Sequence, residues 1–183
     1  MPCAIPEMIF AENNNIIACL FCITSQNYFF IQLNSKKTYT ANEALAKAEN
    51  YCAYQDRCHQ EVRSKLIEWA IYGDDLELII NKLIENKFLD EERFAKSYVR
   101  GKFRIKKWGR IKIEQELKRR DISSYCIKQG FKEIEEEDYR NTLQQLITND
   151  EAMLKTPQTT NKLIQRLMRK GFEYDLIQAL IKQ

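Results

Sequence analysis

Residues 62–76 read VRSKLIEWAIYGDDL, and the same spacing of apolar residues returns in IEQELKRRDISSYCI (113–127) and LIQRLMRKGFEYDLI (163–177). In each stretch the first, fifth, tenth and fifteenth residues are apolar. The three leucines at the fifth position, Leu66, Leu117 and Leu167, lie 51 and 50 residues apart. Four matching positions in three copies at a near-constant period indicate an internal repeat. We predict that each unit is a first helix, a second helix, a short turn with an apolar plug, and a third helix.

Helix start and stop signals surround these stretches. Thr40 and Glu43 have the spacing of a capping box, and Asp90 precedes two glutamates at the start of another apolar stripe. The stretch 73–75 (GDD) breaks one helix and offers an N-cap for the next. Thr156-Pro157 is an N-cap followed by proline at the first helical position, and Gly171 follows two basic residues where a helix should end.

The composition favours the same fold. The 183 residues include only 5 Gly and 3 Pro, too few for the turns of a chain made of many short strands. No glycine-rich phosphate loop is present either. We therefore predict an all-α chain, an elongated array of three tandem three-helix repeats that resemble helix-turn-helix units. The predicted repeats are residues 37–87, 88–134 and 135–183.

Residues 1–36 differ from the rest of the chain. They hold three of the six cysteines and two of the three prolines, and Lys36 is their only base. YFFIQL (28–33) has the composition of a strand, but no partner strand is evident. We treat 1–36 as an appendage of unknown structure. Two alternatives are open. The segment packs over the first helix, or it is upstream sequence that a misplaced translation start has added.

Positive charge is concentrated in residues 93–120. This stretch has twelve Lys and Arg and two Glu, a net charge of about +10, whereas the whole chain has +3. The predicted binding residues are Arg93, Lys96, Arg100, Lys102, Arg104, Lys106, Lys107, Trp108, Arg110, Lys112, Lys118, Arg119 and Arg120. Such a run is typical of a surface that binds a polyanion or an acidic protein. For Trp108, a plug in the turn and a contact with the partner remain equally open.

A second, weaker basic run follows an acidic patch. The run comprises Lys162, Arg166, Arg169 and Lys170, and the patch comprises Glu133, Glu135, Glu136, Glu137 and Asp138. The alternative interpretation of both basic runs is a solvated helix surface, with the acidic patch pairing with part of it in the fold. The sequence leaves this choice open.

Catalytic, metal and membrane functions find little support. His59 is the only histidine, and Cys52 and Cys58 are six residues apart, so they would point in different directions on a helix. The apolar stretch 16–23 is too short to span a membrane. We predict no catalytic residue, no metal, no cofactor, and reduced thiols in a cytoplasmic protein.

The chain resembles the bacterial RecX proteins, regulators of the recombinase RecA. The resemblance rests on YCAYQDRCHQEVRSKL (51–66), FLDEERFAKSYVRGK (88–102), WGRIKIEQEL (108–117) and the closing RKGF (169–172), and it extends over about residues 38–183. It departs from the family at Ala70 and Asp121, which precede the first two plugs where the family often has Gly. Asp121 in particular puts a left-handed cap of the second unit in doubt.

The resemblance implies a non-enzymatic protein of tandem three-helix repeats that binds the RecA–DNA filament, inhibits its ATPase and strand exchange, and also binds single- or double-stranded DNA. We expect such a regulator to act as a monomer. The alternatives are a sequence-independent DNA-binding helical protein without a recombinase partner, and a helical scaffold for other proteins.

Overall fold

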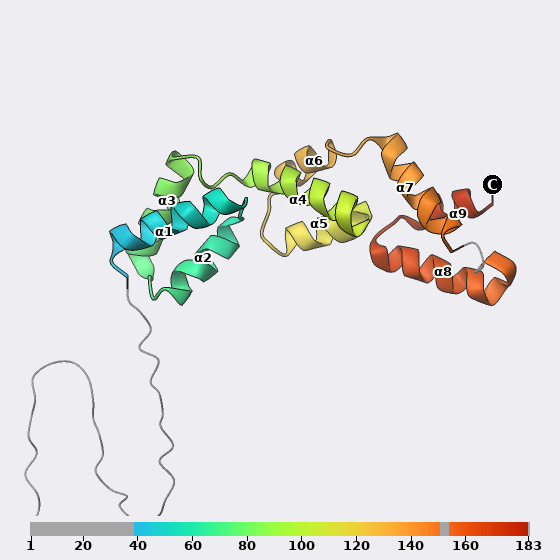
Figure 1. Cartoon of the computed structure of the whole chain (residues 1–183), viewed down its shortest axis with the longest axis horizontal. Helices are drawn as coiled ribbons and strands as arrows, with labels where there is room; N and C mark the ends of the chain where they lie inside the picture. Colours follow the sequence, from blue (N-terminus) through green and yellow to red (C-terminus); the bar gives the residue numbers. More distant parts are fainter. Residues whose placement is uncertain (1–38, 151–153, 183) are drawn as a thin grey trace, which may run out of the picture. The chain divides into compact units, whose positions relative to one another are not determined.

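The computed structural model describes residues 39–150 and 154–182, and the predicted appendage 1–36 with its candidate strand 28–33 lies outside these ranges. Every regular element in the described part is helical, which confirms the predicted all-α fold (Figure 1). The first three helices are α1 (Ala41–Tyr54), α2 (His59–Glu68) and α3 (Gly73–Glu85). The next three are α4 (Glu91–Lys106), α5 (Arg110–Lys118) and α6 (Ser124–Phe131). The last three are α7 (Glu136–Thr148), α8 (Pro157–Lys170) and α9 (Tyr174–Ile181).

The sequence repeat is a repeated helix ending. The plugs Ile71, Ile122 and Phe172 follow α2, α5 and α8, and the backbone N–H of each donates to the carbonyl of the leucine five residues earlier, at 3.0, 3.2 and 3.2 Å. The residue before each plug donates to the carbonyl three residues before itself. These two bonds define the Schellman motif, in which the plug also makes an apolar contact with the leucine. The spacing Leu-x4-plug therefore has one structural meaning in all three repeats.

All twelve apolar repeat positions are buried. They are Val62, Leu66, Ile71, Leu76, Ile113, Leu117, Ile122, Ile127, Leu163, Leu167, Phe172 and Ile177. Their common burial confirms that the period in the sequence is the period of core positions.

The Schellman motif needs a left-handed residue before each plug, and only the last repeat has glycine there. Gly171 has φ +94°, but Ala70 and Asp121 take φ +61° and +57° at the equivalent positions. The left-handed cap of the second unit is therefore present although Asp121 replaces glycine. Asp tolerates this conformation better than Ala, because its short side chain can form local hydrogen bonds.

Most predicted helix starts are confirmed. Thr40 and Glu43 form a capping box, Asp90 accepts from the N–H of Arg93, and Thr156 caps a helix whose first residue is Pro157. The prediction of an N-cap within 73–75 is wrong. Here α3 begins at Gly73 itself, and the two following aspartates lie in the first turn, where they face the positive end of the helix dipole.

The nine helices enclose two hydrophobic cores among the described residues. One core lies entirely within α1–α3 and the segments beside them. The other is continuous through α4–α9, and Cys58 is the only one of its buried members that precedes α4. The second and third repeats thus share one core, whereas the first repeat has its own.

A pair of glycines joins the second repeat to the third. The N–H of Gly109 donates to the Lys170 carbonyl at 2.8 Å, and the N–H of Ile111 donates to the Gly171 carbonyl at 3.1 Å. A Cβ on Gly109 would lie 2.2 Å from the carbonyl oxygen of Gly171, so only glycine fits there. The amino end of α5 therefore caps the carboxyl end of α8, and each satisfies the other's free backbone groups.

Candidate nucleic-acid interface

The structure divides the predicted cations into two sets. One set is ion-paired within the fold: Arg93, Lys96, Arg100, Arg110, Lys118, Arg119, Arg120 and Arg166. In the other set no ammonium or guanidinium has a carboxylate partner among residues 39–150 and 154–182: Lys102, Arg104, Lys106, Lys107, Lys112, Lys162, Arg169 and Lys170. The charge of a paired cation is already balanced by a carboxylate of the same chain. The cations of the second set therefore attract an external anion more strongly.

Arg93 holds the first repeat to the second. Its Nε donates to Asp56 Oδ1 at 2.8 Å, and its two terminal nitrogens donate to the carbonyls of Lys87 and Phe88 at 3.0 and 3.1 Å. Asp56 lies between α1 and α2, and the two carbonyls lie between α3 and α4. The planar fork of the guanidinium therefore clamps two connections at once. These contacts give Arg93 a structural role.

Arg110 serves the fold in a similar way. Its guanidinium lies 4.2 Å from the Tyr139 ring and pairs with Glu136 at 2.7 Å. This contact is the main cause of the lowered pKa of the Glu136 carboxyl. Part of the acidic patch thus pairs with part of the basic run, since Glu133 also pairs with Arg100.

Arg120 is the third cation whose guanidinium is occupied by contacts within the fold. It bonds Glu116 of α5 at 3.0 Å and approaches Glu61 of α2 at 3.7 Å. Its bond to Glu116 is the main cause of the lowered pKa of that carboxyl. Arg120 therefore links the end of α5 to the first repeat.

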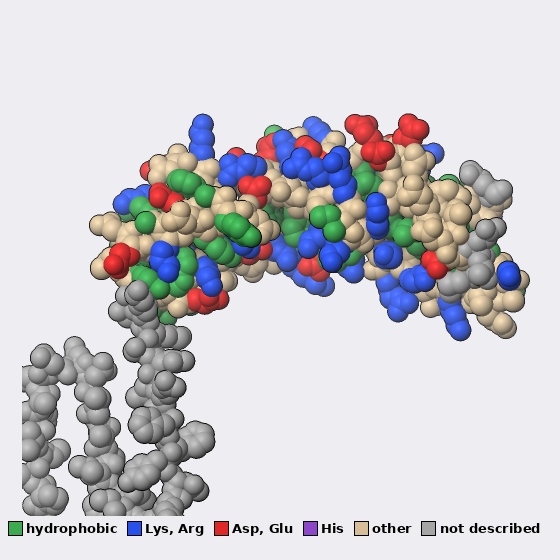
Figure 2. All heavy atoms as spheres, viewed as in Figure 1, with side chains coloured by type: hydrophobic (Ala, Val, Ile, Leu, Met, Phe, Trp, Pro, Cys, Tyr) green, Lys and Arg blue, Asp and Glu red, His purple; other side chains and the backbone are tan. Residues whose placement is uncertain are grey.

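Unpaired cations of both basic runs lie near one another where the end of α4, the start of α5 and the end of α8 meet. The backbone bonds of Gly109 and Ile111 hold residues 107–112 against residues 170–171, and the Lys112 ammonium lies 3.5 Å from the carbonyl oxygen of Arg169. The two basic runs, about fifty residues apart in sequence, are therefore neighbours here. We call Lys107, Lys112, Arg169 and Lys170, together with the exposed Arg104 near the end of α4, the junction cations. Lys and Arg side chains, blue in Figure 2, are numerous over this part of the molecule.

Trp108 lies half-buried at the centre of this junction. It packs against the core of α4–α9, and the ammonium groups of Lys112 and Lys102 lie 4.4 and 5.2 Å from its ring centroid. The indole is a turn plug that also attracts two lysines to its ring. A direct contact of Trp108 with a partner stays a prediction.

The second basic run lies along α8. Arg166 pairs with Asp150, which removes it from the unpaired set. Lys162 and Arg169 are both exposed and lie seven residues apart, so they share one side of the helix. The unpaired cations of α8 therefore extend from the junction, at Arg169, along one side of the helix to Lys162.

Sequence reasoning missed the contact that creates this junction. Tyr139 is fully buried, and its hydroxyl accepts from the N–H of Arg110 at 3.0 Å and donates to Glu173 at 2.7 Å. Its ring also contacts the rings of Phe103 and Phe172. The available signal was the scarcity of glycine, which makes Gly109 and Gly171 conspicuous beside the basic residues.

The cysteines in the described part are buried and free. Cys52, Cys58 and Cys126 form no disulfide. Burial raises the pKa of Cys52 to about 11 and also raises that of Cys58. These two thiols therefore stay protonated and poorly reactive at neutral pH. Among the described helices, none is long and apolar enough to cross a lipid bilayer.

Comparisons with known proteins agree with one another. Residues 90–130 match the family model described as RecX, second three-helix domain. The chain is 25% identical over 162 residues to the regulatory protein RecX of Streptococcus equi subsp. zooepidemicus, covering 88% of this chain and 61% of the relative. It is 30% identical over 152 residues to that of Enterococcus faecalis, covering 80% of this chain and 56% of the relative. The chain thus spans about three fifths of the length of these curated relatives.

Two solved structures each match over 78% of this chain. The crystal structure of RecX from Lactobacillus salivarius superimposes with a TM-score of 0.68 at 27% identity, covering 78% of this chain and 94% of that one. A second crystal structure, of a regulatory protein RecX, has a TM-score of 0.67 at 23% identity and supports the fold.

Proposed function

We propose that this chain, which is similar to RecX regulatory proteins over most of its length, binds the RecA–DNA filament and lowers the ATPase and strand-exchange activities of RecA. The relatives are named regulatory proteins, and regulation by binding needs a surface rather than a catalytic centre. The observation that carries the proposal is the proximity of unpaired cations of both basic runs at the junction of α4, α5 and α8.

The junction cations are suited to phosphate. Five Lys and Arg side chains without a carboxylate partner among the described residues offer charge that is not neutralised within the fold. Each phosphate they neutralise releases a condensed counterion, which gives affinity that falls steeply with salt and does not depend on sequence. We therefore assign the phosphate contacts to these five residues, and a fold-holding role to Arg93, Arg110 and Arg120.

Inhibition follows from occupancy. A helical protein that fills part of a filament groove blocks the second DNA strand or the subunit motions that accompany nucleotide turnover. Such a protein needs no cofactor and no catalytic residue, works as a monomer, and acts in the compartment that holds the DNA.

The test is strand exchange by the cognate RecA at a sub-stoichiometric ratio of this protein, with ATP hydrolysis followed in the same reactions. The proposal predicts that both activities fall as the protein is added. A matched reaction contains the protein with Arg104, Lys107, Lys112 and Lys170 replaced by Ala, and this variant should inhibit much less. Unchanged exchange and ATPase with the unsubstituted protein would overturn the proposal.

A sequence-independent DNA-binding protein without a recombinase partner is the second candidate, and the same unpaired cations favour it. It predicts equal affinity for naked and RecA-coated DNA at one salt concentration. Under the filament proposal the coated DNA binds more tightly, and part of that binding survives the four alanine substitutions.

A further inference from the structure

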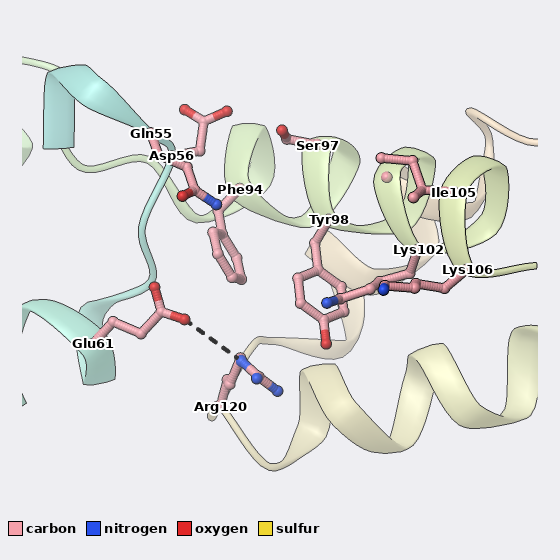
Figure 3. A pocket seen from close by; sticks show the side chains of 11 residues that line it. Gln55, Asp56, Glu61, Phe94, Ser97, Tyr98, Lys102, Ile105, Lys106 and Arg120 are labelled. Atoms are coloured by element: carbon pink, nitrogen blue, oxygen red, sulfur yellow. Dashed lines mark ion pairs between the residues drawn. The ribbon is translucent and has the colours of Figure 1, made fainter. Parts of the chain in front are cut away.

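A cavity of about 290 Å³ lies between the first repeat and the side of α4 (Figure 3). Asp56 and Glu61 line it from the first repeat, and Arg120 lines it from the end of α5. Tyr98, Lys102 and Lys106 line it from α4, and Figure 3 shows the two lysine side chains extending beside each other toward the Tyr98 ring.

The acids in this cavity are already neutralised. Asp56 accepts from Arg93, and Glu61 pairs with both Arg57 and Arg120. By contrast, Lys106 has no carboxylate partner in the described part of the chain, and the described contacts of the Lys102 ammonium are with the rings of Tyr98 and Trp108. The α4 side of the cavity therefore presents positive charge.

The same side presents an apolar strip. Ile105 is 77% exposed, although it lies in the most basic part of the chain. A Cβ on Gly101 would meet no atom within 4 Å, so the helix surface there is open. Tyr98, Gly101 and Ile105 are three and four residues apart, so they share one side of α4. A phosphate backbone gains little binding free energy from contact with an isoleucine or with an open glycine. An apolar side chain of a protein gains binding free energy from both contacts, because its surface is removed from water.

We infer that this α4 groove docks an acidic protein segment that carries an apolar side chain. The apolar side chain covers Gly101 between Tyr98 and Ile105, and a neighbouring carboxylate pairs with Lys102 or Lys106. The inference rests on the proposed function and deepens it, because it assigns the α4 groove to the protein subunits of the filament and the junction cations to its DNA.

Two substitutions test the groove without touching a junction cation. Gly101→Leu fills the open surface with a residue that also favours a helix, so the fold should be retained. Ile105→Ser removes the exposed apolar group. Ile84→Ser is the matched control, because Ile84 is an exposed isoleucine of α3, 44% exposed, outside the cavity. Thermal unfolding of each variant checks its fold.

The measurement is the equilibrium affinity of each variant for RecA filaments on single-stranded DNA and for the same DNA without RecA. We expect Gly101→Leu and Ile105→Ser to weaken filament binding roughly fivefold to tenfold. Naked-DNA binding should stay within about twofold, and Ile84→Ser should change neither affinity.

Unchanged filament binding in both variants overturns the assignment of the groove to a protein segment, but not the proposed function. An equal loss on naked DNA assigns the groove to nucleic acid and also overturns that assignment. No filament binding by the unsubstituted protein overturns the proposed function together with the groove.

Discussion

Ala70 is held in a conformation that glycine adopts more readily. Its φ of +61° is required by the Schellman motif at the end of α2, where its N–H donates to the Ile67 carbonyl. The left-handed region costs a residue with a Cβ about 1–2 kcal/mol. Glycine would remove this cost but would gain freedom in the unfolded chain, which offsets part of the benefit. We predict that Ala70→Gly raises the free energy of unfolding by about 0.5–1 kcal/mol in urea denaturation.

The matched control is an alanine in ordinary helix. Ala46 is exposed in the middle of α1, where glycine is less favourable than alanine by about 1 kcal/mol. Ala46→Gly should therefore lower the free energy of unfolding. If both alanine-to-glycine substitutions destabilise the protein, Ala70 is not under the strain inferred from its φ.

Gly109 is required for space. Its φ of −79° suits any residue, but a Cβ would come within 2.2–2.4 Å of the backbone of Gly171 and Phe172. We predict that Gly109→Ala lowers the free energy of unfolding by about 2 kcal/mol or more, because the two backbones must separate and their hydrogen bonds weaken. Gly101→Ala is the control in open space and should stabilise α4 by about 0.5–1 kcal/mol. Equal effects of the two substitutions in urea denaturation would refute a steric role for Gly109.

At the scale of elements, the Tyr139 hydroxyl joins three helices. It accepts from the first N–H of α5 and donates to Glu173, the N-cap residue of α9, while its own ring belongs to α7. Burial is the main cause of the raised pKa of this phenol. We predict that Tyr139→Phe lowers the free energy of unfolding by about 1–3 kcal/mol, because the partly buried N–H of Arg110 and the carboxylate of Glu173 each lose a partner.

Tyr125→Phe is the matched control, since Tyr125 is largely exposed. It should leave the free energy of unfolding within about 0.5 kcal/mol of the original value. A Tyr139→Phe protein as stable as this control would show that water replaces the hydroxyl at no cost.

Elements were predictable from the sequence to the extent that their signals are local. The plug spacing, the capping box at Thr40 and the cap before Pro157 depend on residues within one or two turns, and all three are present. The division of the basic run into paired and unpaired cations was not predictable. It depends on distant contacts such as Arg93 with Asp56, which lie 37 residues apart. The sequence therefore predicted the basic stretch, but it could not predict which of its cations have ion-pair partners within the fold.

At the scale of the whole described chain, the repeats are joined in two different ways. The first repeat contacts the second through ion pairs such as Arg93–Asp56 and Arg120–Glu61, although Cys58 reaches the larger core. The second and third repeats share a core and backbone hydrogen bonds at Gly109. Ion pairs near the surface are screened by salt, whereas a shared core is not. The junction cations thus belong to the second and third repeats, which are joined more firmly to each other than the first repeat is to the second.

Arg93 tests this distinction. We predict that Arg93→Ala lowers the free energy of unfolding by about 1 kcal/mol and that the loss shrinks as salt is raised. Its affinity for naked duplex DNA at a fixed salt concentration should stay within about twofold of the original value, because its guanidinium is occupied within the fold. A large loss of DNA affinity with unchanged stability would return Arg93 to the binding surface.

The central claim is that the unpaired junction cations, and not the basic run as a whole, bind phosphate. The most direct measurement is the slope of log K against log salt for duplex DNA with two variants that each remove four positive charges. In the first, Arg104, Lys107, Lys112 and Lys170 become Ala; in the second, the ion-paired Lys96, Arg100, Lys118 and Arg119 become Ala. At about 0.9 per phosphate contact, the slope should become shallower by about 3–4 in the first variant and by less than about 1 in the second. Equal changes in the two variants would contradict the claim.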